Sequence, residues 1–224
     1  MKPGLLINFE GLDGTGKSTQ LRRAVRYIRK CGYRVLVTRE PGGTRTGERI
    51  RDILLASKTG KLAPLAELAL MYAARAQLLQ EVVCPALARG DVVVSDRFNT
   101  ASFAYQGYGR ELGVAAVRAF DRVICGRTQP DLTIVLDLDP ESARGRALGD
   151  ARRGAQLDRI EAAGLAFHKR VRAGYLAIAR REPQRVKLVR ADQTIEEMQS
   201  QIRAFIAPLL KQRTRNSKLE IRKS

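Results

Sequence analysis

The chain has 224 residues, 44% of them hydrophobic, and its formal net charge at pH 7 is +18. This length suffices for one domain with a full hydrophobic core, and no segment approaches the ~18 consecutive apolar residues of a membrane helix. We therefore exclude a membrane-spanning protein and expect a soluble, cytoplasmic one without a secretory signal. The positive charge attracts polyanions, but it does not distinguish nucleotides from nucleic acid or an acidic membrane.

The three cysteines, Cys31, Cys84 and Cys125, are odd in number and widely spaced. This pattern favours neither a disulfide framework nor a metal cluster, so it fits a reducing compartment. We predict that all three are small packing residues without a chemical role.

Short runs rich in β-branched residues alternate along the chain with longer segments of helical period. Near-continuous apolar strands separated by helices predict an α/β fold, in which a five-stranded parallel sheet is covered by helices on both faces. The expected strands are residues 5–9, 34–38, 91–95, 132–138 and 185–189.

The first two expected strands enclose the sequence GLDGTGKST, with the spacing Gly11-x-x-x-x-Gly16-Lys17-Ser18. The strand before it ends at Phe9, and a helix is expected to begin near Lys17. A strand, a glycine-rich loop and a helix in this order are the setting of a P-loop that holds the phosphates of a nucleoside triphosphate.

The chemistry of such a loop assigns roles to its residues. Backbone N–H groups and the helix N-terminus hold the β-phosphate, Lys17 reaches the β and γ oxygens, and Ser18 can bind Mg²⁺. The predicted ATP-binding residues are Gly11, Leu12, Asp13, Gly14, Thr15, Gly16, Lys17, Ser18 and Thr19.

The third expected strand is followed directly by Asp96 and Arg97. Ligands of open α/β sheets bind at the carboxyl ends of the strands, so these side chains are expected at a ligand. The carboxylate can organise Mg²⁺ or its waters, and the arginine can grip a phosphate. A surface ion pair is the alternative.

Two arginine-rich segments interrupt the helical pattern in the second half of the chain. Residues 143–158 contain several glycines and are predicted to form a mobile lid loop between two helices. The last helix has an apolar stripe from Ile195 to Leu209, and residues 211–224 after it are predicted to form a loosely ordered basic tail. We expect a solvated end there; a nucleic-acid contact is the alternative.

Seven motifs together resemble the bacterial thymidylate kinases: FEGLDGTGKST, TREPGGT, YAARAQ, SDRF, AYQG, PDLTIVLDL and LDRIE, in the family's order and at about its spacing. The resemblance covers residues 5 to about 210. It implies one domain over residues 1–210 with a P-loop nucleoside monophosphate kinase fold, usually a homodimer. It also implies transfer of the γ-phosphate of MgATP to dTMP, giving dTDP for dTTP synthesis.

The resemblance also implies catalytic residues. Asp13 matches an acidic residue near the acceptor nucleotide and the metal, and Lys17 and Arg97 match phosphate-binding cations. Gly14 stands where some members carry an arginine, and members that lack it place the catalytic cation in the lid, which here implies Arg152 and Arg153.

The dTMP-binding residues are implied in the same way. Arg39 lies near the segment that matches the lining of the acceptor pocket, Arg51 matches an arginine that contacts the acceptor phosphate, and Arg75 matches the arginine that bonds the thymine edge. Ser102 and Tyr105 match residues that hold the base and crowd the ribose 2′ position. The full implied set is Asp13, Arg39, Glu40, Pro41, Arg51, Met71, Arg75, Arg97, Ser102 and Tyr105, with Ser18 and Asp96 for Mg²⁺. The Glu40-Pro41 bond is often cis in relatives.

Two departures from the family concern the base. Many relatives have phenylalanine, stacked on thymine, at the place of Met71, and serine is common at the place of Ala101. A kinase of the same fold with altered or broad base preference is therefore an alternative. A basic ATPase that depends on nucleic acid is a more distant alternative.

Overall fold

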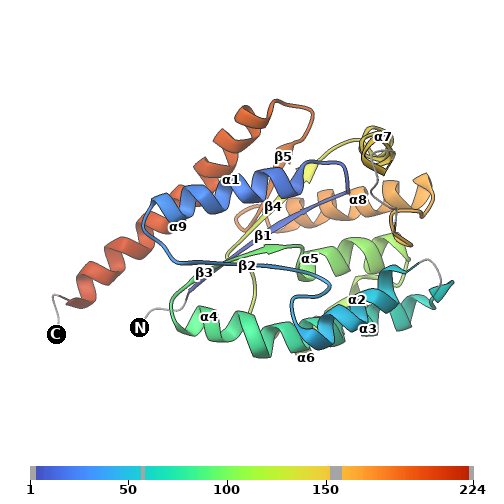
Figure 1. Ribbon diagram of the computed structural model, residues 1–224, viewed down its shortest axis with the longest axis horizontal. Coiled ribbons are helices and arrows are strands. Elements are labelled where there is room, and N and C mark those ends of the chain that lie inside the picture. Colours follow the sequence, from blue (N-terminus) through green and yellow to red (C-terminus); the bar gives the residue numbers. More distant parts are fainter. Residues whose placement is uncertain (1–3, 57–58, 152–157, 222–224) are drawn as a thin grey trace.

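The computed structural model describes residues 4–56, 59–151 and 158–221. Within these residues the centre of the fold is one five-stranded sheet (Figure 1). All strand pairs are parallel, and the strand order is β2-β3-β1-β4-β5. The strands are β1 Leu5–Gly11, β2 Val35–Arg39, β3 Val92–Asp96, β4 Leu132–Asp137 and β5 Val186–Arg190. The five predicted strands and their parallel arrangement are confirmed.

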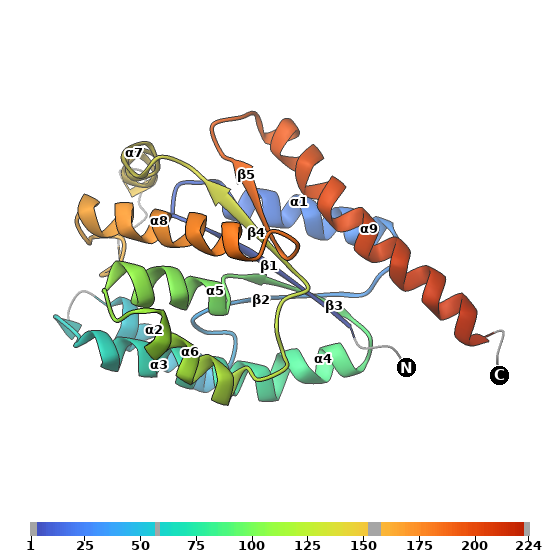
Figure 2. The same cartoon turned by 180° about the vertical axis from the view of Figure 1, so that it is seen from behind.

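Helices cover both faces of the sheet, as Figures 1 and 2 show from opposite sides. Neighbouring residues of β1 point to opposite faces: Ile7 packs in a cluster that includes α1 and α9, whereas Leu6 packs in a cluster with α3, α4 and α6. The α-helices are α1 Lys17–Lys30, α2 Arg45–Leu55, α3 Pro64–Leu78, α4 Cys84–Ala88, α5 Asn99–Ser102, α6 Val114–Ile124, α7 Pro140–Ala151, α8 Leu165–Arg181 and α9 Ile195–Ile221. Two π-helical segments, η2 Leu79–Val83 and η3 Phe103–Gly109, continue α3 and α5.

The predicted lid is helical over most of its described part, because α7 runs from Pro140 to Ala151. Asp139 Oδ2 accepts the backbone N–H groups of Glu141 and Ser142, which caps the helix, and Ala143 is only 1% exposed. The interpretation of residues 143–151 as an irregular loop is wrong. Residues 152–157, with Arg152 and Arg153, lie outside the described residues.

The predicted basic tail does not begin as an irregular extension. Helix α9 continues through Pro208 to Ile221, so the backbone of residues 211–221 is helical. Buried Met198, Ile202 and Ile206 anchor the first part of the helix, and the lysines, arginines and glutamine that follow are good helix formers, which allows it to continue. Of the helices in the described ranges, none is long and apolar enough to cross a membrane.

The cysteines are all free. Cys125 is buried in the cluster with α3, α4 and α6, which confirms its predicted packing role. Cys31 and Cys84 are exposed, so the packing interpretation is wrong for those two.

Candidate active site

The glycine-rich loop joins the end of β1 to the start of α1, as its sequence predicts. Gly11 has a φ of 131°, and a Cβ atom there would lie 2.5 Å from the carbonyl oxygen of Leu136. A Cβ at Gly14, whose φ is 80°, would lie 2.3 Å from the carbonyl oxygen of Ala143 in α7. A side chain at position 14 is therefore excluded by the helix that leads to residues 152 and 153.

Lys17 is buried under the loop that it follows. Its Nζ donates to Asp13 Oδ1 at 3.0 Å and to the carbonyl oxygen of Leu12 at 3.2 Å. The ammonium group is thereby held at the loop, where the phosphates of a nucleotide would lie.

Arg97 lies across the same loop from the carboxyl end of β3. Its Nη2 donates to both carboxylate oxygens of Asp13 at 2.9 Å, and its Nη1 donates to the carbonyl oxygen of Gly11 at 3.1 Å. Burial raises the pKa of Asp13, but the charges of Arg97 and Lys17 outweigh it and hold this pKa well below its usual range. Arg97 has a φ of 67°, a conformation that is uncommon for a non-glycine residue and that clusters at functional sites.

Glu10, near the end of β1, is a buried carboxylate that sequence reasoning missed. Its Oε1 accepts the backbone N–H groups of Phe98 and Ala101, both at 3.0 Å, and its Oε2 accepts the hydroxyl of Tyr175 at 2.7 Å. Burial raises the pKa of Glu10, against the charge of Arg97 and these hydrogen bonds. Through these hydrogen bonds Glu10 holds the backbone between Arg97 and α5 in place.

A buried ion pair forms the floor of a cavity beside this turn. Arg75, 2% exposed, donates from Nε to Glu40 Oε2 at 2.7 Å and from Nη2 to the hydroxyl of Ser102 at 3.1 Å. Its guanidinium carbon lies 4.4 Å from the ring centre of Tyr72 and 5.5 Å from that of Phe98. Its Nη1 has no hydrogen-bond partner among the described residues.

The remaining walls of this cavity carry two further arginines. Arg39 pairs with Glu48 at 2.7 Å, and Arg51 Nη1 donates to the carbonyl oxygen of Pro41 at 2.9 Å; the Glu40-Pro41 bond is cis. Burial and then the charge of Arg39 lower the pKa of Arg51. Nearby positive charges of this kind suit an anionic ligand.

All the residues predicted to bind dTMP line this one cavity, which we call the acceptor cavity. They are Asp13, Arg39, Glu40, Pro41, Arg51, Met71, Arg75, Arg97, Ser102 and Tyr105. Ala101, Gln106, Asp158 and Glu161 also line it. The guanidinium carbon of Arg97 lies 4.9 Å from the ring centre of Tyr105, which fixes these two side chains against each other.

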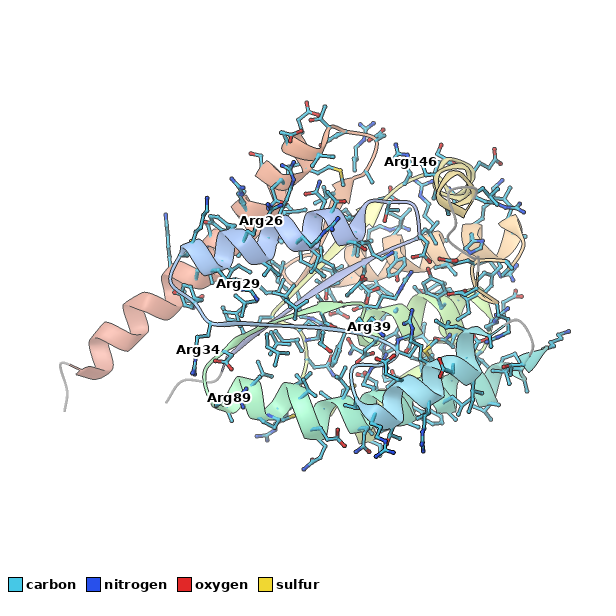
Figure 3. All side chains as sticks on the ribbon, viewed as in Figure 1. Arg26, Arg29, Arg34, Arg39, Arg89 and Arg146 are labelled. Atoms are coloured by element: carbon cyan, nitrogen blue, oxygen red, sulfur yellow. The ribbon has the colours of Figure 1, made fainter. Side chains whose placement is uncertain are left out.

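A second, more open cavity lies on the other side of the loop, and we call it the donor cavity. Its lining contains Asp13 to Thr19 together with Arg146, Gly149, Ala191, Gln193, Ile195 and Met198. Gly11 and Leu12, also predicted to bind ATP, do not line it; their carbonyl oxygens accept from Arg97 and Lys17 instead. Figure 3 labels Arg146, which belongs to α7, and Arg39, the last residue of β2. The two cavities share Asp13, Lys17 and Ser18.

Ser18 and Asp96, the predicted Mg²⁺ residues, both line the acceptor cavity. Asp96 Oδ1 is buried without a hydrogen-bond partner in the described chain, so it is an oxygen that a hard cation would fit. The described residues contain no group of three or more side chains of the histidine, cysteine, aspartate and glutamate types that could hold a metal. A magnesium ion needs only one or two protein oxygens when phosphates complete its coordination.

Glu67 is a second buried carboxylate that sequence reasoning missed. Gln106 Nε2 donates to it at 2.9 Å, Arg110 Nη2 at 3.1 Å and Arg159 Nη2 at 2.7 Å. Arg159 also donates from Nε to the carbonyl oxygen of Leu54. These contacts tie the segment after residues 152–157 to α2, α3 and η3.

The loop, the parallel sheet and the two cavities that meet at Lys17 are those of a P-loop nucleotide kinase. The family described as thymidylate kinase matches residues 9–202. The chain is similar to the thymidylate kinases of Deinococcus radiodurans, 45% identical over 92% of this chain and 98% of the relative, and of Pseudomonas syringae pv. syringae, 46% identical over 92% and 97%. It is also similar to the crystal structure of thymidylate kinase from Ehrlichia chaffeensis, with a TM-score of 0.73 and 28% identity over 92% of this chain and 99% of that one. The chain belongs to the thymidylate kinase family.

Proposed function

We propose that this protein transfers the γ-phosphate of ATP to dTMP and releases dTDP and ADP, a step of dTTP synthesis. The observation that supports the proposal is that a cavity with a buried arginine and a second cavity at the glycine-rich loop share Asp13, Lys17 and Ser18. Family membership supports the same activity.

ATP occupies the donor cavity in this proposal. The loop N–H groups and the start of α1 hold the β-phosphate, and Lys17 turns from Asp13 to the β and γ oxygens. Ser18 and Asp96 would hold Mg²⁺, directly or through water, and the ion would supply positive charge to these phosphates. An oxygen of the dTMP phosphate attacks the γ-phosphorus, and the bond to the β-phosphate oxygen breaks.

The acceptor needs no general base. The second pKa of a phosphate monoester is near ~6, so the attacking oxygen is largely ionised at neutral pH. Catalysis then consists of positioning and charge neutralisation. Arg39, Arg51 and Arg97 supply positive charge for the acceptor phosphate.

The cation for the transferred group comes from Arg152 or Arg153 in this proposal. Position 14 cannot carry the arginine that some relatives have, because the backbone of α7 occupies its space. Arg152 and Arg153 directly follow α7 in the sequence but lie outside the described residues, so the proposal for them rests on the family resemblance.

The base is held at the floor of the acceptor cavity. Arg75 Nη1, which has no hydrogen-bond partner among the described residues, can donate to a carbonyl oxygen of thymine. The hydroxyl of Ser102, which accepts from Arg75 Nη2, can also contact the base. Met71 lies along the cavity wall, where its thioether can contact the ring face, and Tyr105 crowds the ribose 2′ position.

We also propose a homodimer that forms through α3 and α6. The outward face of α3 exposes a row of alanines at helical spacing, Ala66, Ala69, Ala73 and Ala76, and Leu65 is 56% exposed. On the neighbouring α6, Val123 is 84% exposed. Analytical ultracentrifugation of the parent and of Ala73→Glu tests this: a monomeric parent contradicts it.

The free thiols fit the reducing cytoplasm, where we place the enzyme.

A turnover panel tests the acceptor. ADP release with dTMP, dUMP, UMP and CMP at equal concentrations is expected to be fastest with dTMP and slowest with CMP, because Arg75 donates where cytosine carries an amino group. Equal rates favour the kinase with broad base preference, to which Met71 and Ala101 point. ATP hydrolysis that DNA stimulates and dTMP does not would favour the nucleic-acid-dependent ATPase.

A further inference from the structure

Five arginines gather on a part of the surface that neither cavity uses. They lie on the outer side of α1, at the start of the edge strand β2 and just after α4; Figure 3 labels four of them along this side. We call this surface the basic face; its residues are Arg22, Arg26, Arg29, Arg34 and Arg89. None of the five lines the acceptor or the donor cavity.

Helix α1 makes this face strongly positive. Its sequence, KSTQLRRAVRYIRK, contains no acidic residue. Arg22, Arg26 and Arg29 follow one another at spacings of four and three residues, so they lie in a row, and all three are exposed. Within the described part of the chain, none of the three forms an ion pair.

The hydrogen bonds that these arginines do make leave their charge uncompensated. Arg22 Nε donates to the carbonyl oxygen of Ser18 at 3.1 Å, and Arg29 Nη2 donates to that of Val35 at 3.4 Å. Carbonyl groups are neutral, and each guanidinium has further N–H groups to offer.

Arg34 and Arg89 extend the row beyond α1 but share one carboxylate. Arg34 Nε lies 2.9 Å from Asp91 Oδ1, and Arg89 Nη2 lies 3.1 Å from Asp91 Oδ2. The basic face therefore combines five guanidinium groups with one paired carboxylate, which leaves four positive charges uncompensated on a chain of +18.

The surface between α1 and β2 is hollowed rather than flat. The groove has an apolar floor with arginines along one side, and its lining consists of Thr19, Leu21, Arg22, Val25, Arg26, Arg29 and Val37. No aromatic side chain is among these residues, so the groove offers no platform on which bases could stack. It suits a ligand that presents repeated negative charges and needs no base recognition.

The spacing of the arginines fits a repeating phosphate chain. With a rise of 1.5 Å per helical residue, Arg22 and Arg26 are separated by about 6 Å along the axis of α1, and Arg26 and Arg29 by about 4.5 Å. Phosphates of one DNA strand advance by about 3.4 Å per nucleotide along the helix axis. If α1 lies along the axis of the duplex, neighbouring arginines are therefore separated by between one and two nucleotide steps.

The edge of β2 favours a phosphate chain over an added peptide strand. An open edge can pair with another strand, and charged side chains at an edge oppose such pairing. Here Arg29 already donates to the Val35 carbonyl oxygen, one of the groups that an added strand would use.

We propose that the basic face binds the sugar-phosphate backbone of nucleic acid independently of base sequence.

The test is a fluorescence-anisotropy titration of the full-length protein with labelled duplex DNA of about 20 base pairs at salt concentrations from roughly 50 to 200 mM. The variant is R22Q/R26Q/R29Q. The control is R118Q/R180Q/R181Q, which removes the same charge from exposed positions on α6 and α8; Arg180, like Arg22, donates to a carbonyl oxygen one helical turn earlier.

The parent and the control are expected to bind alike, and the variant more weakly. If each arginine contacts one phosphate, the slope of log K against log salt falls by about 0.9 per arginine, so that over a fourfold salt increase the parent loses about 40-fold more affinity than the variant. Thermal melts and ADP release should be unchanged in the variant, which separates this surface from the kinase site.

Three outcomes overturn the proposal. The parent binds no DNA at the lowest salt; the variant and the control lose affinity equally, which assigns the effect to net charge; or the parent binds poly-glutamate or vesicles of anionic phospholipid as tightly as DNA. Failure of kinase activity in the parent would instead contradict the proposed function and leave the DNA titration interpretable.

Discussion

The acceptor and donor cavities lie at the same edge of the sheet but are built differently. The acceptor cavity is formed by side chains that are fixed by one another, such as Arg75 by Glu40 and Ser102. The donor cavity is formed mainly by the backbone of the glycine-rich loop, with Lys17 as its buried cation. Backbone N–H groups are the same in every residue, whereas a set of oriented side chains distinguishes one ligand from another. In the proposed function, substrate identity is therefore determined by the side chains of the acceptor cavity and phosphate binding by the backbone of the loop.

The largest effect is expected on the acceptor side, from Arg75→Met. This change leaves the carboxylate of Glu40 buried without its partner, which should lower the free energy of unfolding by about 3–5 kcal/mol. Chemical denaturation measures this loss. The control is R75M/E40Q, which removes the uncompensated charge and should recover part of the stability. Equal instability of both variants would show that the ion pair does not fix this cavity.

The lid arginines test the donor side. Replacing Arg152 and Arg153 together by alanine should lower kcat by a factor that reaches ~10³, with little change in the KM for ATP. Arg146→Ala, in the wall of the donor cavity, is the control and should affect mainly that KM. If the double variant raises the KM for ATP and leaves kcat unchanged, Arg152 and Arg153 do not supply the catalytic cation.

Lys17→Ala should lower kcat on the order of 10²-fold while the protein remains folded, because loop N–H groups cannot replace a full positive charge. Steady-state kinetics measure the change in kcat, and a thermal melt shows whether the variant is folded. Lys30→Ala, at the exposed end of the same helix, should change neither. Near-normal turnover in a folded Lys17→Ala protein would remove the phosphate-binding role from the loop.

Met71→Phe should give the smallest effect. An aromatic ring on a base contributes ~1–3 kcal/mol and a thioether contact ~0.3–1.5 kcal/mol, so phenylalanine should gain about 1 kcal/mol. The KM for dTMP should fall several-fold with kcat unchanged, because the stacking is equal in ground and transition states. Met71→Leu, which has neither ring nor sulfur, should raise this KM slightly. Weaker dTMP binding by Met71→Phe would show that position 71 does not face the base.

Patterns local in sequence predicted much of the fold. β-Branched runs predicted all five strands. The central strands β1, β3 and β4 are buried on both faces and therefore need a continuous apolar segment, whereas the edge strands β2 and β5 are partly exposed. Glycine spacing predicted the loop and the start of α1. The helix α7 was missed because its buried face consists of small residues such as Ala143, which leave almost no apolar period. Its cap at Asp139 was the available signal.

The roles of the buried carboxylates Glu10 and Glu67 could not be predicted from a local pattern. Glu67 meets Arg110 and Arg159, which are 43 and 92 residues away in sequence, and Glu10 meets Tyr175 across 165 residues. Such partners become neighbours only in the folded chain. The dTMP-binding residues assigned through the family resemblance all line the acceptor cavity, because a family motif carries tertiary information with it.

The unpartnered Nη1 of Arg75 also sets a rule for inhibitor chemistry. A compound in the acceptor cavity that places a hydrogen-bond acceptor against this nitrogen would satisfy a buried charged donor that lacks a partner among the described residues, whereas a methyl group or an amino group there would not. The compound need not be anionic at that end, because Glu40 already balances the charge of Arg75. Neutral heterocycles with one well-placed carbonyl are therefore the natural starting scaffolds, and they avoid the poor membrane passage of phosphate mimics.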